Sequence, residues 1–227
     1  MNENNFTKGS VLKTLVKFSL PILFALFLQS LYGAVDLLVV GQFGETTDTS
    51  GVSTGSQLMQ TVTMIITGIS MGITVFVGQK IGEGNDDEAG KAIGSGNALF
   101  ILIGIIVSLI LVIFAPYLAS LLHAPIEAFS QTVSYITVCG IGAIFICLYN
   151  LLGAIFRGIG DSKTPLITVL IACVTNIVGD LVLVAAFHMG ATGAALATIL
   201  AQAISVIISL LIIKKKKLPF TFKLNYI

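Results

Sequence analysis

The sequence predicts an all-α membrane protein, a polytopic bundle of six transmembrane helices. Of its 227 residues, 56% are hydrophobic and only 10% are charged, whereas a soluble domain needs a surface with about 25–35% charged residues. The apolar residues form six uninterrupted runs of about 20 residues each, the length at which a helix crosses a hydrocarbon core. Membrane β-strands would be shorter and would alternate in polarity, so a barrel is excluded.

We expect the six spans near 18–40, 52–78, 92–114, 132–156, 166–187 and 191–213. The breaks between them are polar or contain Pro and Gly, which end helices. The spans form one six-helix unit, residues 1–213, and residues 214–227 follow as a basic cytoplasmic tail or as the truncated start of a linker to a second lobe. The plainest interpretation of the lysines Lys214 to Lys217 is an anchor against anionic lipid.

The basic residues predict the orientation of the bundle. All 12 Lys and Arg precede the first span, follow the sixth, or flank the second and fourth loops. Cytoplasmic loops are enriched in Lys and Arg, so both termini are expected on the cytoplasmic side of the cell membrane. The formal net charge is only +1, which leaves no basic excess to hold nucleic acid, and nucleic acid is excluded as a main partner.

Two acids fall within the predicted spans, and they are the main candidates for an ion-coupling site. Asp36 lies in the first span and Asp180 in the fifth, each fifteen residues after a proline, Pro21 or Pro165. That separation is roughly 22 Å of helical rise, so we expect both carboxyls at similar depth. A carboxylate in hydrocarbon costs about 2.5–3.5 kcal/mol or more and usually faces a wet cavity. The alternative for both is an interfacial acid near the end of its span.

A polar network is expected around these carboxyls. Gln29 and Tyr32 share a helix face with the first carboxyl, Asn176 lies one turn before the second, and Thr198 could face it from the sixth span. Tyr32, Asn176 and Thr198 could instead serve helix packing. Carboxyl and amide oxygens suit either a proton or Na⁺, so the sequence leaves the coupling ion open. No further cofactor and no metal site is expected.

The second span is unusually polar. Its residues Gln57, Thr61, Met64 and Met71 recur near helical spacing. They are candidates for lining a substrate cavity, since Met adapts to varied ligands. The alternative is close packing against another helix, which the pair Gly68 and Gly72 favours.

Pro21 interrupts the backbone hydrogen bonds of the first span. A proline inside a helix frees a carbonyl about one turn earlier, which predicts a bend. The alternative is a proline in the first helical turn, where it costs little.

Four short runs occur in a characteristic order. They are Leu20 to Gly41 with Pro21, Gln29, Tyr32 and Asp36; Gly78 to Gly82 with Asn85; Phe156 to Pro165; and Asn176 to Asp180 followed by Gly190 to Thr198. Together they resemble the N-terminal half of the MATE (multidrug and toxic compound extrusion) transporters of the MOP superfamily. The resemblance covers nearly the whole chain, and the order of the runs on six spans is more specific than any single run.

The resemblance implies one lobe of a twelve-helix antiporter, which exports organic, often cationic, drugs or metabolites in exchange for H⁺ or Na⁺ by alternating access. It implies that Asp36 is the coupling carboxylate and that Pro21 bends the helix on protonation. The surrounding network would be Gln29, Tyr32, Asn176, Asp180 and Thr198. Because a whole member has about twice as many spans, we expect a fragment or a pairing of two copies. A second six-helix lobe, a small organic substrate and membrane lipid are the expected partners.

Three other classes of function fit the sequence less well. A lipid-linked sugar or oligosaccharide flippase of the same superfamily would need cationic residues in its cavity to hold pyrophosphate. No Lys or Arg lies deep within the predicted spans. An inactive half-transporter or subunit is a further alternative. An enzyme is not expected, because the Gly158 to Asp161 string of intramembrane aspartyl proteases lies in a predicted loop and lacks its partner motif. No arrangement of Ser or Cys with His suggests another catalytic site.

Overall fold

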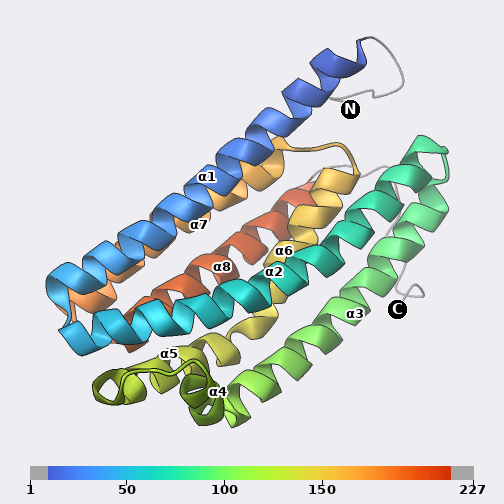
Figure 1. The fold of residues 1–227 in the computed structure, drawn as a ribbon. Helices are drawn as coiled ribbons and strands as arrows, with labels where there is room; N and C mark the ends of the chain where they lie inside the picture. Colours follow the sequence, from blue (N-terminus) through green and yellow to red (C-terminus); the bar gives the residue numbers. More distant parts are fainter. Residues whose placement is uncertain (1–9, 216–227) are drawn as a thin grey trace.

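The computed structural model describes residues 10–215 as a bundle of helices, without strands in that range (Figure 1). The helices are α1 (Val11–Phe43), α2 (Thr46–Gly82), α3 (Asp86–Ile113), α4 (Ala115–Leu121), α5 (Phe129–Ile141), α6 (Ala143–Gly158), α7 (Lys163–Asp180) and α8 (Gly190–Lys215). A 3-10 turn, η1 (Ile126–Ala128), precedes α5, and a π-helix, η2 (Leu181–Ala186), follows α7. Of the expected tail at 214–227, the first two lysines end α8 and the rest lies outside the described residues.

The predicted fold class, a polytopic bundle with six spans, is confirmed. Five helical segments within residues 10–215 are long and apolar enough to cross a membrane, and the bent pair of η1–α5 and α6 gives a sixth when it is counted as one span. The first two helices are longer than the predicted spans, with 33 residues in α1 and 37 in α2. Polar turns extend them at either end, where hydrophobicity gives no signal.

The span expected at 132–156 is not one straight helix, so this prediction was wrong in detail. η1–α5 and α6 meet at an angle of 54°. Gly142 lies between them, and a Cβ there would collide with Ile199 of α8. A Cβ on Gly140 would lie 2.8 Å from the Cβ of Leu111 on α3. The bend therefore lies where two neighbouring helices approach the backbone, and glycine permits both approaches.

The helix α1 continues through Pro21. It begins at Val11, so Pro21 lies well inside the helix and the first-turn alternative is wrong. Figure 1 shows no abrupt change of direction in α1. A bend at Pro21 stays a prediction.

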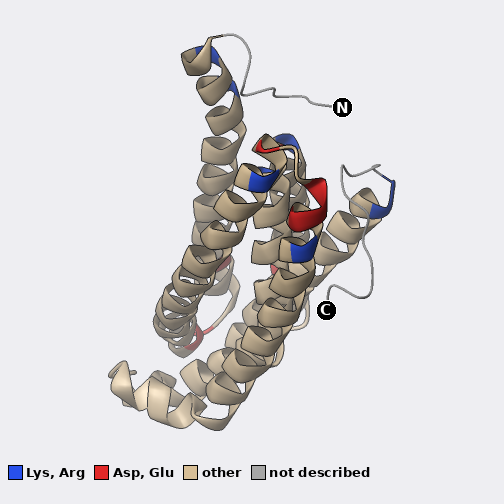
Figure 2. Ribbon diagram, turned by 90° about the vertical axis from the view of Figure 1, so that its right-hand side faces the viewer, with Lys and Arg blue, Asp and Glu red and all other residues tan. Residues whose placement is uncertain are grey.

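The helices α1 and α2 meet at one end of the bundle and diverge toward the other (Figure 1). The Lys and Arg residues within 10–215 gather at the end where these helices diverge, which we call the basic end (Figure 2). α7 packs along both α1 and α8, and α6 packs on α2, α3 and α8.

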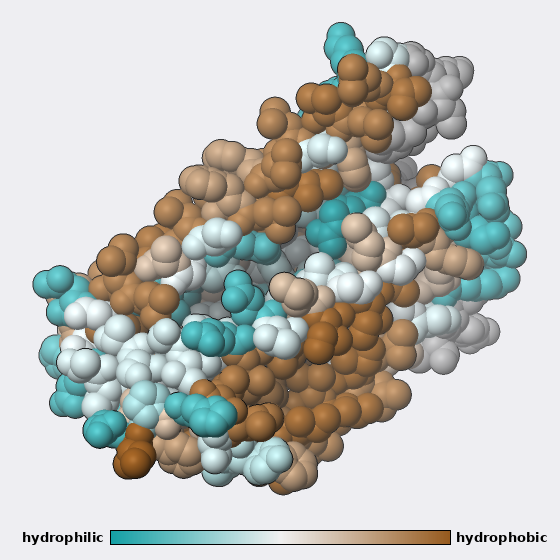
Figure 3. Space-filling view, viewed as in Figure 1, coloured by the Kyte–Doolittle hydropathy of each residue, from teal (hydrophilic) through white to brown (hydrophobic). Residues whose placement is uncertain are grey.

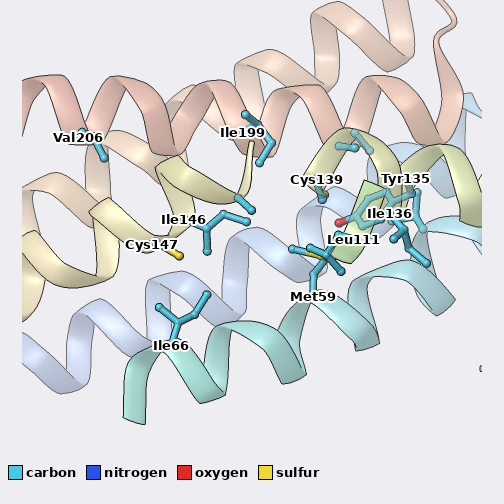
Figure 4. Packing of buried hydrophobic residues seen from close by; sticks show 14 of the residues in the cluster. Met59, Ile66, Leu111, Tyr135, Ile136, Cys139, Ile146, Cys147, Ile199 and Val206 are labelled. Atoms are coloured by element: carbon cyan, nitrogen blue, oxygen red, sulfur yellow. The ribbon is translucent and has the colours of Figure 1, made fainter. Parts of the chain in front are cut away.

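The hydrophobic core lies where α2, α3, α5, α6 and α8 meet (Figure 4). Each of these helices contributes at least one buried side chain: Met59, Leu111, Tyr135, Ile146 and Ile199. α1 and α7 share a smaller cluster around Ala25, Leu28 and Val169. The larger core also includes Val39 and Val40 near the end of α1, so α1 joins both clusters.

Close packing on α2 occurs at Gly51 and Gly55. A Cβ on Gly51 would lie 2.6 Å from the Cβ of Gln131, and one on Gly55 would likewise run into α5. A Cβ on Gly68 or Gly72 would meet nothing within 4 Å. The close packing expected at Gly68 and Gly72 is therefore wrong within residues 10–215, and an equally spaced glycine pair earlier on the same helix provides it.

Asp48 ties the start of α2 to the start of α8 at the end opposite the basic end. Its Oδ1 accepts the Ala191 N–H at 2.9 Å, and its Oδ2 accepts the Glu45 N–H at 3.2 Å. Gly190 has a φ of +51° and passes so close that a Cβ there would collide with the Asp48 carboxylate. A carboxylate at a helix N-terminus satisfies free N–H groups and complements the helix dipole.

We expect Asp48→Ala to lower the free energy of unfolding by about 1–2 kcal/mol, because removing a capping side chain costs that much. Thermal unfolding in detergent, followed by circular dichroism, measures the change. Glu127→Gln removes an exposed acid and should stay within about 0.5 kcal/mol of the parent chain. Equal stability of the two variants would mean that the Asp48 contact does not hold α8 in place.

Candidate functional site

Asp36 and Asp180 meet inside the bundle, between α1 and α7. Their exposed fractions are 6% and 0%. The two carboxyl groups lie within hydrogen-bonding reach of each other. Asp180 is the last residue of α7, and the π-helix η2 continues the chain beyond it. The structure therefore brings together two acids that are 144 residues apart in the sequence.

Most oxygens of this carboxyl pair lack a hydrogen-bond donor in the described part of the chain. Oδ1 of Asp36 and both carboxylate oxygens of Asp180 have no hydrogen-bond partner among the described residues. The ion pairs described within residues 10–215 involve Lys80 and Lys91 at the basic end. Two buried carboxylates repel each other, and buried polar atoms without partners are costly. A proton held between them, or a small cation such as Na⁺, would relieve both penalties.

Asn176 and Thr198 extend the polar site from α7 to α8. Asn176 is 1% exposed, and its Nδ2 donates to Thr198 Oγ1 at 3.3 Å, while its Oδ1 has no partner among the described residues. Gly179 permits this contact, because a Cβ on it would lie 2.9 Å from the Cβ of Ala197 on α8. The two helices thus approach closely beside Asp180.

Gln29 and Tyr32 connect the site to α6. Tyr32 is half-buried one turn before Asp36, close enough for its hydroxyl to interact electrostatically with that carboxyl. Gln29 Nε2 donates to Tyr149 Oη at 3.2 Å. Sequence reasoning missed Tyr149, whose signal is weak because an aromatic residue in an apolar span is ordinary.

Gln202 is a second polar residue that sequence reasoning missed. It lies one turn after Thr198 on α8, and its Oε1 is buried without a partner among the described residues. The spacing of four residues from Thr198 was the available signal. Oxygen atoms without donors thus occur on α1, α7 and α8.

The surface is hollowed between α1 and α2, with hydrophilic side chains along its walls (Figure 3). The four α2 residues predicted to line a substrate cavity are all exposed, with Met64 at 71% and Met71 at 59%. The other two are Gln57 and Thr61. They lie on a different side of α2 from its buried Met59 and Ile66, and their role as a substrate lining stays a prediction.

Arg157 lies at the end of the bent span. It is half-buried in the last turn of α6. Helix α6 extends two residues past the predicted end at 156, so Arg157 belongs to the helix but does not lie deep within the span.

Asp161 has a structural role. Its Oδ1 accepts the backbone N–H groups of Lys163 and Thr164, and its Oδ2 accepts the Thr164 hydroxyl. It therefore caps the start of α7. No group of three His, Cys, Asp or Glu side chains suited to a metal ion occurs within residues 10–215.

These features define a class of protein: a multi-pass helical membrane protein with a buried carboxyl pair between two of its helices and a hollow in its surface. Residues 21–182 match the MatE family. The chain belongs to this family.

Curated relatives cover nearly the whole chain. The probable multidrug resistance protein YpnP of Bacillus subtilis (strain 168) is 32% identical over 224 residues, which are 97% of this chain and 50% of that protein. The multidrug export protein MepA of Staphylococcus saprophyticus is 26% identical over 234 residues, 98% of this chain and 49% of that protein. The chain spans about half the length of the curated relatives it matches.

Solved structures show the same fold. A MOP superfamily transporter from Pyrococcus furiosus has a TM-score of 0.86 at 21% identity, covering 92% of this chain and 46% of that one. A MATE in the straight conformation has a TM-score of 0.82 at 22% identity, covering 93% and 47%. The six-helix bundle described above is thus similar to about half of a larger transporter.

Proposed function

We propose that the chain is the cation-coupling lobe of an antiporter, which exports an organic, often cationic, drug or metabolite in exchange for H⁺ or Na⁺. The observation that carries this proposal is the carboxyl pair Asp36 and Asp180, buried, adjacent and with most of its oxygens lacking a donor in the described residues. The names of the relatives, a multidrug resistance protein and a multidrug export protein, agree with it.

The mechanism follows from the position of α1. This helix carries Asp36 and also forms one wall of the hollow, so a cation at the carboxyl pair and a substrate in the hollow act on the same helix. If each ligand disfavours the other, the coupling free energy is typically about 1–3 kcal/mol. Pro21 removes one backbone hydrogen bond of α1 and is the point at which the helix would bend. A membrane potential of 100 mV adds about 2.3 kcal/mol per charge moved.

A second six-helix lobe would complete the transporter. We propose that it packs over the hollow and that alternating access is the rocking of the two lobes, with Gln57, Thr61, Met64 and Met71 lining the cavity between them. The exposure of these residues and the coverage of half of each relative support this arrangement. The basic end is proposed to face the cytoplasm of the cell, with both termini on that side.

Transport in proteoliposomes that contain the chain together with the second six-helix lobe that completes it tests the proposal. Ethidium, a fluorescent organic cation, is loaded inside, and either a pH gradient or a Na⁺ gradient is imposed across the membrane. We expect one gradient to drive ethidium out faster than from protein-free liposomes. Ethidium loss that is the same with and without both gradients would contradict cation coupling.

Asp180→Asn should weaken cation binding at the pair, because the amide removes one of the two negative charges. A hydrogen bond to a charged group is worth about 1.5–3 kcal/mol, so roughly tenfold more cation should be needed to displace bound ethidium. Fluorescence titrations of ethidium binding against pH and against Na⁺ measure this shift. The same titrations with Glu127→Gln, which lies outside the site, should match the parent chain. An unshifted curve for Asp180→Asn would mean that Asp180 does not take part in cation binding.

A further inference from the structure

One face of α6 opens into the hollow between α1 and α2. Tyr149 on this helix accepts a hydrogen bond from Gln29 of α1 at 3.2 Å. The next residue, Asn150, accepts one from Thr67 of α2 at 3.0 Å through its Oδ1. The α6 surface between these two contacts therefore points between α1 and α2. Arg157 lies two turns further along α6 on that same surface, seven residues after Asn150.

The Arg157 guanidinium has no protein partner in the part of the chain that the structure describes. None of the described ion pairs or side-chain hydrogen bonds includes it. The guanidinium folds back along α6, with its Nη1 3.2 Å from the position of a Cβ on Gly153. Gly153 lies one turn away from the basic end, so the side chain turns toward the interior, whereas a lysine or arginine at a helix end usually extends toward water.

One further hydrogen-bond donor, the Tyr149 hydroxyl, lies near this guanidinium. The Tyr149 hydroxyl, on the same face of α6, accepts from Gln29 and keeps its own O–H free to donate. It is close enough for Arg157 to influence it electrostatically. A guanidinium fork beside a hydroxyl donor fits an oxyanion, such as a phosphate, which it binds through two parallel N–H groups.

We propose that Arg157, with Gly153 and Tyr149, forms a phosphate-binding subsite at the basic end of the hollow. Gly153 leaves the space in which the guanidinium lies against the helix. The phosphate belongs either to a lipid headgroup that enters the hollow or to a soluble ligand. The site is separate from the carboxyl pair and does not depend on cation coupling.

Binding to the purified chain in nanodiscs tests the subsite. One arm uses nanodiscs of phosphatidylcholine with phosphatidylglycerol and counts retained phosphatidylglycerol by native mass spectrometry. The other uses phosphatidylcholine nanodiscs and radiolabelled inorganic phosphate. We expect Arg157→Gln to weaken binding about tenfold or more in one arm, the loss of a charge-assisted hydrogen bond. Lys214→Gln removes an exposed charge at the same end and should stay within about twofold of the parent chain.

Arg157→Lys separates a specific site from general electrostatic attraction. It keeps the positive charge but loses the planar fork that binds phosphate through two N–H groups, so we expect binding to fall several-fold. Loss in the phosphatidylglycerol arm alone assigns a lipid, and loss in the phosphate arm assigns a soluble ligand. Equal effects of Arg157→Gln and Lys214→Gln, or no binding above protein-free nanodiscs in either arm, would overturn the proposal.

Discussion

Replacing Asp36 by Asn should reduce gradient-driven efflux to the level of vesicles without the protein. Asparagine keeps the size of the side chain but can neither release a proton nor balance the charge of a bound Na⁺. Asp180 would then face an amide instead of a carboxyl, and the pair could not alternate between cation-loaded and empty states. Gradient-driven accumulation of ethidium in everted vesicles, in which export from the cytoplasmic face appears as uptake, checks this result, with the amount of protein in the membrane measured by immunoblotting.

Two variants control the Asp36 experiment. Asp36→Glu keeps a carboxyl on the same helix and should retain part of the efflux, because a longer side chain can still approach Asp180 on α7. Glu127→Gln removes an acid from an exposed turn and should leave efflux unchanged. Full efflux by Asp36→Asn, at normal protein levels, would show that this carboxyl does not couple transport to an ion.

Gly51→Ala should destabilise the bundle by about 1–3 kcal/mol, the usual cost of overpacking a tight contact. The new methyl would lie 2.6 Å from the Gln131 Cβ and 3.0 Å from the Gln131 carbonyl carbon, and neither atom can rotate away. α2 and α5 would have to separate near their starts. Thermal unfolding of the purified chain in detergent measures the loss.

Gly68→Ala is the matched control on the same helix. Its added methyl would meet nothing within 4 Å, and alanine is favoured over glycine in a helix by up to about 1 kcal/mol. We therefore expect unchanged or slightly increased stability of the lobe. A larger loss for Gly68→Ala than for Gly51→Ala would mean that the packing of α2 is assigned to the wrong face.

The number of spans could be predicted because hydrophobicity along the chain reports directly on burial in lipid. The bend between α5 and α6 could not, since it depends on how closely Ile199 and Leu111 approach Gly142 and Gly140. Both glycine pairs on α2 have the same spacing, and the sequence does not say which one meets another helix. Only the positions of α5 and α2 distinguish Gly51 from Gly68.

The residues of the candidate site could be predicted where placing the side chain in lipid costs much free energy. Asp36 and Asp180 could be singled out because a carboxylate within a membrane span has a high free-energy cost, and in the structure the two side chains are adjacent. Tyr149 could not be found in this way, because a tyrosine in a span costs little. Arg157 was assigned to a loop, since its burial depends on α6 extending past residue 156 and on the side chain folding toward Gly153.

The most direct measurement is the release of a cation from the purified chain when substrate binds. Ethidium is added to the protein in weakly buffered detergent solution, and released protons are counted with an indicator dye; a parallel sample loaded with radioactive sodium reports displaced Na⁺. We expect one of the two ions to leave, and none to leave from Asp36→Asn. Substrate binding without release of either ion, or with equal release from Asp36→Asn, would contradict a shared carboxyl site.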